Sequence, residues 1–184
     1  LVYYYPPKGV NLTDALIEVS HLKNSVVLTG SMGSPLRNVQ LLNLHFAHNE
    51  RTFMDTKEPL LRSDWTIYRG GAVLLDGTEN CKIADCVFEG IGGNAIMFSN
   101  YNKRDTVTGC HIYNTGANAV CFIGDTKAVR SPSFRYENYI PYNQLDKTPG
   151  PLTNNFPQEC IVTDNLLHDL GDIEKQATGV QIEV

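Results

Sequence analysis

The chain reads Ile83-Ala84-Asp85-Cys86-Val87-Phe88 and, 24 residues further on, Val107-Thr108-Gly109-Cys110-His111-Ile112. Apolar positions align with apolar positions in the two stretches, and Cys86 aligns with Cys110. The match continues beyond them, because Gly92-Gly93-Asn94-Ala95-Ile96-Met97-Phe98 aligns with Gly116-Ala117-Asn118-Ala119-Val120-Cys121-Phe122. A unit of about 24 residues, made of short alternating strands and Gly/Asn turns, is typical of one coil of a parallel β-helix.

Further copies of the unit lie on both sides of this pair. Residues 39–46 and 160–167 align with residues 81–88, while Ala72-Val73-Leu74-Leu75 and Gly179-Val180-Gln181-Ile182 repeat the second strand. Strands stacked about 4.8 Å apart would form two inward apolar ladders. The first ladder contains Val73, Ile96, Val120 and Val180, and the second contains Leu75, Phe98, Phe122 and Ile182. At Asn94 and Asn118 we expect a turn with a left-handed backbone and a bond between neighbouring coils.

These matches predict an all-β chain folded as a parallel β-helix, a solenoid of about four coils. The alternative is a β-sandwich with evenly spaced strands, which would need the position-specific matches to arise by chance. Two long loop insertions interrupt the coils, at about residues 47–70 and 125–158. Loops of this length are usually functional or disordered, and the aromatic residues in both favour order.

The two ends of the chain indicate a segment of a longer polypeptide. It begins with Leu1 rather than Met, and its first residues do not resemble a signal peptide. It ends in the alternating run Gly179–Val184, which is typical of the middle of a strand and has no turn or cap after it. We therefore expect residues 1–184 to form a single β-helix segment that is truncated at its C-terminal end.

The composition excludes several classes of protein. With 42% hydrophobic and 19% charged residues, the chain is too apolar for a disordered protein. The sequence has no apolar run of the roughly 18 residues that a membrane span requires. The formal net charge of −5 does not favour nucleic acid as a partner.

The candidate site lies on an outer face, because the interior of a β-helix is filled with side chains. We place it on the strand at residues 72–76, 95–99, 119–123 and 179–183, which precedes the larger loops. By alternation the outward residues are Leu74, Asp76, Met97, Ser99, Cys121, Ile123, Gln181 and Glu183. The candidate catalytic carboxyl groups are those of Asp125, Asp172 and Glu183, with Glu174 nearby. For any one of these acids the alternative is a solvated surface carboxylate.

Two carboxyl groups at a defined separation are what glycoside hydrolysis requires. The separation is about 5–5.5 Å for retention of configuration and about 6.5–9.5 Å for inversion. Adjacent coils would place side chains about 4.8 Å apart, and alternate coils about twice as far apart. This spacing suits acid/base hydrolysis by a carboxylate pair.

Polar and aromatic residues close to these acids are candidates for substrate binding. They are Tyr101, Asn102, Lys103, Lys127, Lys175 and Gln181. Lys127 and Lys175, like Arg104 and Arg130, would bind substrate carboxylates, or alternatively are ordinary exposed basic residues. Tyr101, like Tyr136, Tyr139 and Tyr142 in the second insertion, would stack on a sugar ring, or alternatively pack its own loop against the wall.

The histidines and cysteines do not predict a metal site, and we expect no cofactor. No two histidines show the HxxxH spacing of a zinc site, and His45 and His48 fall on a strand and a loop. The odd count of five cysteines does not indicate a disulfide framework. Cys86 and Cys110 share one column, as small buried thiols or as a disulfide.

Several stretches resemble the right-handed parallel β-helix enzymes of glycoside hydrolase family 141. They are Glu58–Val73, Ser99–Asn102, Gly124–Pro132 and Glu174–Glu183, and the similarity extends from about Tyr3 to Val184. Enzymes of this family occur in bacteria that degrade plant cell walls, and their activities include α-L-fucosidase action on complex pectin and xylanase activity. The resemblance implies a right-handed coil and a chain that continues for several more coils.

The resemblance and the acidic residues together lead to one functional hypothesis. We expect a bacterial, periplasmic or extracellular glycoside hydrolase segment, a monomer, acting on an oligosaccharide or polysaccharide of the plant cell wall. One alternative is a polysaccharide lyase, although no acidic group of the calcium-binding kind found in β-helix pectate lyases lies on one strand face. The other is a non-catalytic carbohydrate-binding or structural β-helix.

Overall fold

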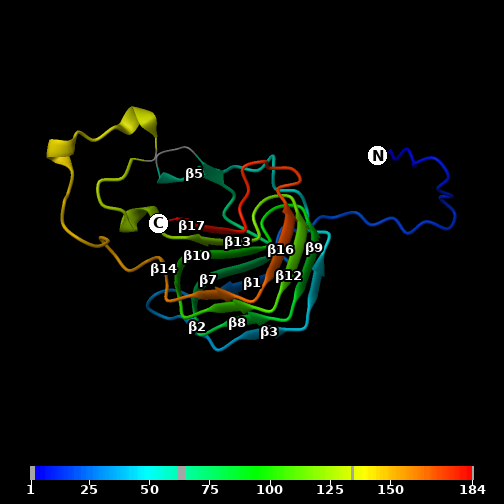
Figure 1. Cartoon of the computed structure of the whole chain (residues 1–184), viewed down its shortest axis with the longest axis horizontal. Helices are drawn as coiled ribbons and strands as arrows, with labels where there is room; N and C mark the ends of the chain where they lie inside the picture. Colours follow the sequence, from blue (N-terminus) through cyan, green and yellow to red (C-terminus); the bar gives the residue numbers. More distant parts are fainter. Residues whose placement is uncertain (1–2, 62–64, 134, 184) are drawn as a thin grey trace.

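The chain is all-β, and most of its strands lie in parallel sheets (Figure 1). The computed structural model describes residues 3–61, 65–133 and 135–183. Within those residues there is no α-helix, and the helical turns are the short 3-10 segments η2 (Thr126–Ala128), η3 (Tyr136–Asn138) and η4 (Tyr142–Gln144). No helix of the described chain is long and apolar enough to cross a membrane.

Three parallel sheets carry the fold. The first sheet has the order β1 (Val26–Thr29), β7 (Val73–Glu79), β10 (Ile96–Lys103), β13 (Val120–Ile123) and β17 (Val180–Glu183), with β2 (Leu36–Arg37) on β7 and β14 (Pro157–Gln158) on β10. The second sheet contains β3 (Gln40–Leu42), β8 (Lys82–Ala84), β11 (Thr106–Thr108) and β15 (Ile161–Thr163). The third sheet contains β4 (His45–Ala47), β9 (Val87–Ile91), β12 (His111–Thr115) and β16 (Leu166–Leu170).

The chain visits the three sheets in turn, and we call each such pass a circuit. β7, β8 and β9 make one circuit, and β10, β11 and β12 make the next. Each circuit returns to the first sheet beside the strand that it left, so residues 24 positions apart pair, as Ile96 does with Val120. The alignment of the repeated units is therefore confirmed as a register between parallel strands.

Left-handed residues mark the three corners of a circuit. One lies before the second sheet, one between the second and third sheets, and one near the end of the strand in the third sheet. They recur five residues apart, at Asn38, Asn43 and His48; at Asn80, Asp85 and Gly90; at Arg104, Gly109 and Asn114; and at Glu159, Asp164 and Asp169. Asn, Asp and Gly tolerate this conformation better than other residues, so they predominate at these corners.

The predicted asparagine ladder is confirmed in its bonds but wrong in its backbone. The side-chain amide and backbone N–H of Asn118 both donate to Oδ1 of Asn94, at 3.0 and 3.2 Å. Asn94 in turn donates to the carbonyl oxygens of Tyr68 and Gly70. Neither Asn94 nor Asn118 has a positive φ. The residues with a left-handed backbone lie at the corners described above instead.

Both predicted apolar ladders are confirmed. Ile96 pairs with Val73 and Val120, and Phe98 pairs with Leu75 and Phe122. The Phe98 and Phe122 rings stack with their centroids 4.5 Å apart. Strand β1 extends the first sheet in register with β7. All five cysteines are free thiols, so Cys86 and Cys110 form no disulfide.

The outer face of the first sheet is covered, which corrects the expectation of an open face there. Met97, Cys121 and Ile123 point outward but are fully buried against Leu60 and Ile67. These last two residues belong to or flank the antiparallel hairpin β5 (Glu58–Pro59) and β6 (Thr66–Ile67), so the first insertion folds back as a lid.

Arg69 fastens this hairpin to the sheet. Its guanidinium donates to the carboxylate of Glu58, to Oγ of Ser99 and to the carbonyl oxygens of Ile123 and Gly124. Because the hairpin covers the middle of this face, a substrate would reach the first sheet only at the edges of the covered area.

Candidate functional site

A hollow of about 430 Å³ at one margin of the covered face brings together several of the expected site residues. We call it the Asp125 hollow. It is lined by Gly30, Ser31, Met32, Gly33, Asp76, Gly77, Asn100, Tyr101, Asp125, Lys127, Thr153 and Asn155. One wall comes from the loop after β1 and the opposite wall from the second insertion, so the hollow lies across β7 and β10.

Strand register brings the carboxylate of Asp76 to this hollow. Asp76 pairs with Ser99 of β10, and the next residue, Asn100, has a left-handed backbone with φ of 55°. The side-chain amide of Asn100 donates to both carboxylate oxygens of Asp76, at 3.1 and 3.2 Å. Asp76 is thereby held in one orientation at the point where the register between β7 and β10 shifts.

Asp125 is oriented by the turn that it begins. It is the N-cap of η2, and its Oδ1 accepts from the backbone N–H of Lys127 at 2.9 Å. The amide of Asn155 donates to its Oδ2 at 2.8 Å. These hydrogen bonds, the one from Lys127 first, lower the pKa of Asp125 below its ordinary value because they favour the carboxylate form.

Tyr101 forms part of the wall of the hollow rather than an exposed stacking platform. Its ring is only 8% exposed, and its hydroxyl donates to the carboxylate of Glu79. Burial and the neighbouring Glu79 raise the pKa of Tyr101 to about 12. Glu79 itself is paired with Arg37 at 2.9 Å.

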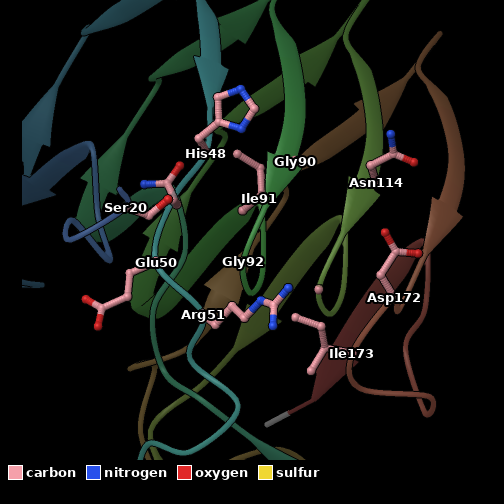
Figure 2. A pocket seen from close by; sticks show the side chains of 12 residues that line it. Ser20, His48, Glu50, Arg51, Gly90, Ile91, Gly92, Asn114, Asp172 and Ile173 are labelled. Carbon is pink, nitrogen blue, oxygen red and sulfur yellow. The ribbon is translucent and has the colours of Figure 1, made fainter. Parts of the chain in front are cut away.

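A second and larger hollow, of about 600 Å³, contains Asp172. We call it the Asp172 hollow. Figure 2 shows the Arg51 guanidinium between Gly92 and Ile173, with Asp172 directed toward Asn114. Further lining residues are Ser20, His48, Asn49, Glu50, Gly90, Ile91 and Gly116. The polar groups here are spread along an open wall, and the structure holds none of them in a shared network with Asp172.

Glu183 lies apart from both hollows, beside Leu61, Ala128 and Arg130. Its backbone carbonyl accepts from the N–H of Gly124 at 2.9 Å, so it neighbours Asp125 along the sheet without lining the same space. Burial raises the pKa of Glu183, against an opposing hydrogen bond from the backbone of Leu61. The three expected catalytic acids therefore line three different hollows.

The other expected binding residues are engaged within the protein. Asn102 is buried between the strands of the first sheet, where its side-chain amide donates to the carbonyl oxygen of Ser99 at 2.8 Å. Lys103 pairs with Glu159 at 3.4 Å. Lys175 donates to the carbonyl oxygens of Gly171 and Asp172, and Gln181 accepts from the hydroxyl of Thr178.

Of the tyrosines in the second insertion, Tyr139 and Tyr142 are exposed, and Lys147 lies over the Tyr142 ring at 3.8 Å. The side chain of Tyr136 and residues 62–64 of the stretch that carries the resemblance lie outside the described residues.

Sequence reasoning missed the partners that complete the Asp125 hollow. Alternation along the strand places Asp76 on the outer face, but it does not identify Asp76 as an acid of the site. Asn100 and Asn155 were not singled out. An available signal was the pairing of Asp76 with Ser99, which puts Asn100 next to the carboxylate.

No cluster of three or more His, Cys, Asp or Glu side chains suited to a metal ion occurs in the part of the chain that the structure describes. Comparison of the chain with protein-family models, with curated proteins and with solved structures gives no match.

Proposed function

We propose that the chain is a segment of a right-handed parallel β-helix glycoside hydrolase that acts on plant cell-wall polysaccharide. The substrate would be fucosylated pectin, for an α-L-fucosidase, or xylan. One observation carries the proposal: the carboxylates of Asp76 and Asp125 line one hollow together with amide and phenol groups. Carboxylates and amides are the groups that hold sugar hydroxyls and move protons at a glycosidic bond.

The order of the strands supports the β-helix part of the proposal. Each circuit passes through the same three parallel sheets, and within each circuit a residue with a left-handed backbone recurs every five positions. A chain that stacks its own repeats in this way forms a solenoid, whose outer surface can carry an extended sugar chain. Right-handedness follows the general preference of parallel crossover connections.

The spacing of the strands that lead to the two carboxylates favours an inverting mechanism over a retaining one. Asp76 lies in β7, and Asp125 follows β13 by two residues; both strands pair with β10. Two strand spacings separate β7 from β13, about 9.6 Å. This backbone spacing is nearer to the separation of the carboxyl groups in inverting enzymes, about 6.5–9.5 Å, than to the separation of about 5–5.5 Å in retaining enzymes.

The hydrogen bonds to Asp125 suggest how the two roles would be divided. Because Lys127 and Asn155 stabilise its ionised form, Asp125 would act as the base that takes a proton from the attacking water. Asp76, whose two oxygens accept from Asn100, would protonate the leaving oxygen because it is the other carboxyl group of the hollow. Glu183 is a second candidate for the proton donor, since burial raises its pKa and its backbone bonds to Gly124, next to Asp125.

The test measures release of sugars from fucosylated pectin fragments and from xylan by the full-length protein. In Asp125→Asn we expect kcat/KM to fall by about 10²–10⁴-fold, the usual contribution of a positioned acid or base. The matched control is Asp164→Asn, the same change at an exposed left-handed corner, where Asn is equally well tolerated. Its activity should remain within about twofold of the wild type.

Two further variants identify the proton donor. If Asp76 is the donor, Asp76→Asn should abolish cleavage of natural substrates but spare aryl glycosides, whose leaving groups need little protonation. Glu183→Gln should show that pattern instead if Glu183 is the donor. Absence of sugar release from both substrates by the wild type would overturn the proposed hydrolysis, and ultraviolet-absorbing products would indicate a lyase. Full activity of Asp125→Asn would exclude this hollow.

A further inference from the structure

The open face of the third sheet carries a pair of histidines that the proposed hydrolysis does not use. His111 lies in β12 and His168 in β16, and the two strands are adjacent (Figure 1). Because His168 pairs with Tyr113, His111 and His168 are diagonal neighbours on this face. Their Nε2 atoms are 2.8 Å apart, and the side chain of His168 is 42% exposed.

Asp169 determines which nitrogen of His168 carries a proton. Its Oδ2 lies 2.8 Å from Nδ1 of His168, so in neutral His168 the proton is on Nδ1 and donates to the carboxylate. The left-handed backbone of Asp169, with φ of 49°, turns the carboxylate back onto the preceding ring. The lone pair on Nε2 of His168 therefore faces Nε2 of His111.

Tyr113 holds the two rings in place. Its ring centroid is 4.4 Å from that of His111 and 5.3 Å from that of His168, and it is nearly parallel to His168. The Tyr113 hydroxyl bonds to the Glu89 carboxylate, which raises the pKa of Tyr113. A pair of imidazoles with restricted rings loses less freedom when both bind one ion.

We propose that His111 and His168 form a two-histidine site for a divalent transition metal of tetragonal geometry, with Cu²⁺ the preferred ion. Two nitrogen ligands at about 2.0 Å from a metal and at a right angle to each other are about 2.8 Å apart, whereas tetrahedral Zn²⁺ would separate them by about 3.3 Å. The observed distance of 2.8 Å between the two Nε2 atoms equals the distance expected for ligands at a right angle. Among divalent first-row metals Cu²⁺ binds such nitrogen donors most tightly.

The metal would replace the proton that the two Nε2 atoms share. That proton is the single proton of neutral His111, and it moves to Nδ1 of the same ring through water, so both imidazoles stay neutral and no net proton is released. Asp169 would act on the metal through His168, since a carboxylate on the far nitrogen orients a ligand and raises its basicity. Water fills the other positions of the metal, because the site has two protein ligands and the described residues include no third His, Cys, Asp or Glu placed to complete it.

The test titrates CuCl₂ into the chelator-treated, untagged full-length protein, followed by calorimetry and by electron paramagnetic resonance. We expect one Cu²⁺ with two equatorial nitrogens, bound at least about tenfold more tightly than Zn²⁺. His111→Ala and His168→Ala should each lower the Cu²⁺ affinity at least about tenfold, and Asp169→Asn should lower it by about 10–100-fold.

The control is His45→Ala, which removes an exposed histidine of the same face that pairs with Glu89 at 3.3 Å. Its Cu²⁺ affinity should match that of the wild type, and melting temperatures report whether each variant is folded. An equal loss of affinity in His45→Ala, or unchanged binding in folded His111→Ala, would overturn the proposal. A spectrum with one equatorial nitrogen would also overturn it.

Discussion

The middle circuits and the last strand of the first sheet carry the same apolar ladders but differ in exposure. Val120 is 0% exposed and Phe122 6%, whereas their register partners Val180 and Ile182 are 39% and 71% exposed. β13 lies between β10 and β17, while β17 pairs only with β13 among the described strands. A ladder residue is thus buried when its strand has neighbours on both sides. The repeat in the sequence does not predict this difference in exposure between equivalent positions.

The largest effect that tests this comparison is the loss of a ring from a middle circuit. Phe98→Ala should destabilise the 184-residue chain by about 3–5 kcal/mol, because the buried ring stacks on Phe122 and leaves a cavity. Ile182→Ala removes the equivalent ladder residue of the last strand, and its exposure should limit the loss to less than about 1 kcal/mol. Urea unfolding of both variants measures the difference, and equal losses would refute the comparison.

The strands were predictable because each circuit repeats one pattern of apolar residues. The ladder through Ile96 and Val120 follows from the 24-residue spacing alone. The hairpin lid was not predicted, although the outward residues Met97, Cys121 and Ile123 are apolar and would form an exposed apolar patch if uncovered. That composition was a signal that the first insertion packs there.

The grouping of the site residues was harder to predict because insertions break the repeat. The second insertion leaves the stack after Asp125 and returns as β14 beside β10, so Asn155 meets Asp125 across 30 residues. The same insertion lengthens the separation of His111 and His168 to 57 positions, which hides their contact from any search for short metal-binding spacings. Short sequence patterns predict the strands. The Asp125–Asn155 and His111–His168 contacts depend instead on the point at which the second insertion rejoins the sheets.

A smaller effect is expected from the polar ladder. Asn118→Ala removes the acceptor of the Thr178 N–H and the donor to Asn94 in a buried position, so we expect a loss of about 2–3 kcal/mol. Gln181→Ala, in the last strand, breaks only a 3.3 Å contact with Thr178 and should cost less than about 0.5 kcal/mol. Urea unfolding of both variants measures these losses. Comparable unfolding midpoints would show that the polar contacts, unlike the apolar ones, contribute equally to stability in the middle circuits and in the last strand.

The smallest effect is the dependence of stability on pH. It compares Asp105, a buried acid of a middle circuit, with Asp125, at the margin of the covered face. Burial raises the pKa of Asp105, although the Thr78 hydroxyl and the Cys81 N–H donate to its carboxylate at 2.6 and 2.7 Å. The folded state therefore binds this proton more tightly than the unfolded state does. The contribution of Asp105 to stability is complete below its unfolded pKa and is lost as the pH rises through the folded pKa.

Asp125 should show the opposite dependence. Its pKa is lowered in the folded state, so its contribution is present above the unfolded pKa and is lost as the pH falls through the folded pKa. Asp105→Asn should therefore raise the melting temperature near neutral pH relative to pH 3, and Asp125→Asn should lower it there. We expect each change to be within about 2–4 °C, the effect of roughly 1 kcal/mol in a chain of this length. Slopes of the same sign in thermal unfolding between pH 3 and 7 would mean that the two carboxyl groups share one environment, which would contradict the contrast between the stack interior and its margin.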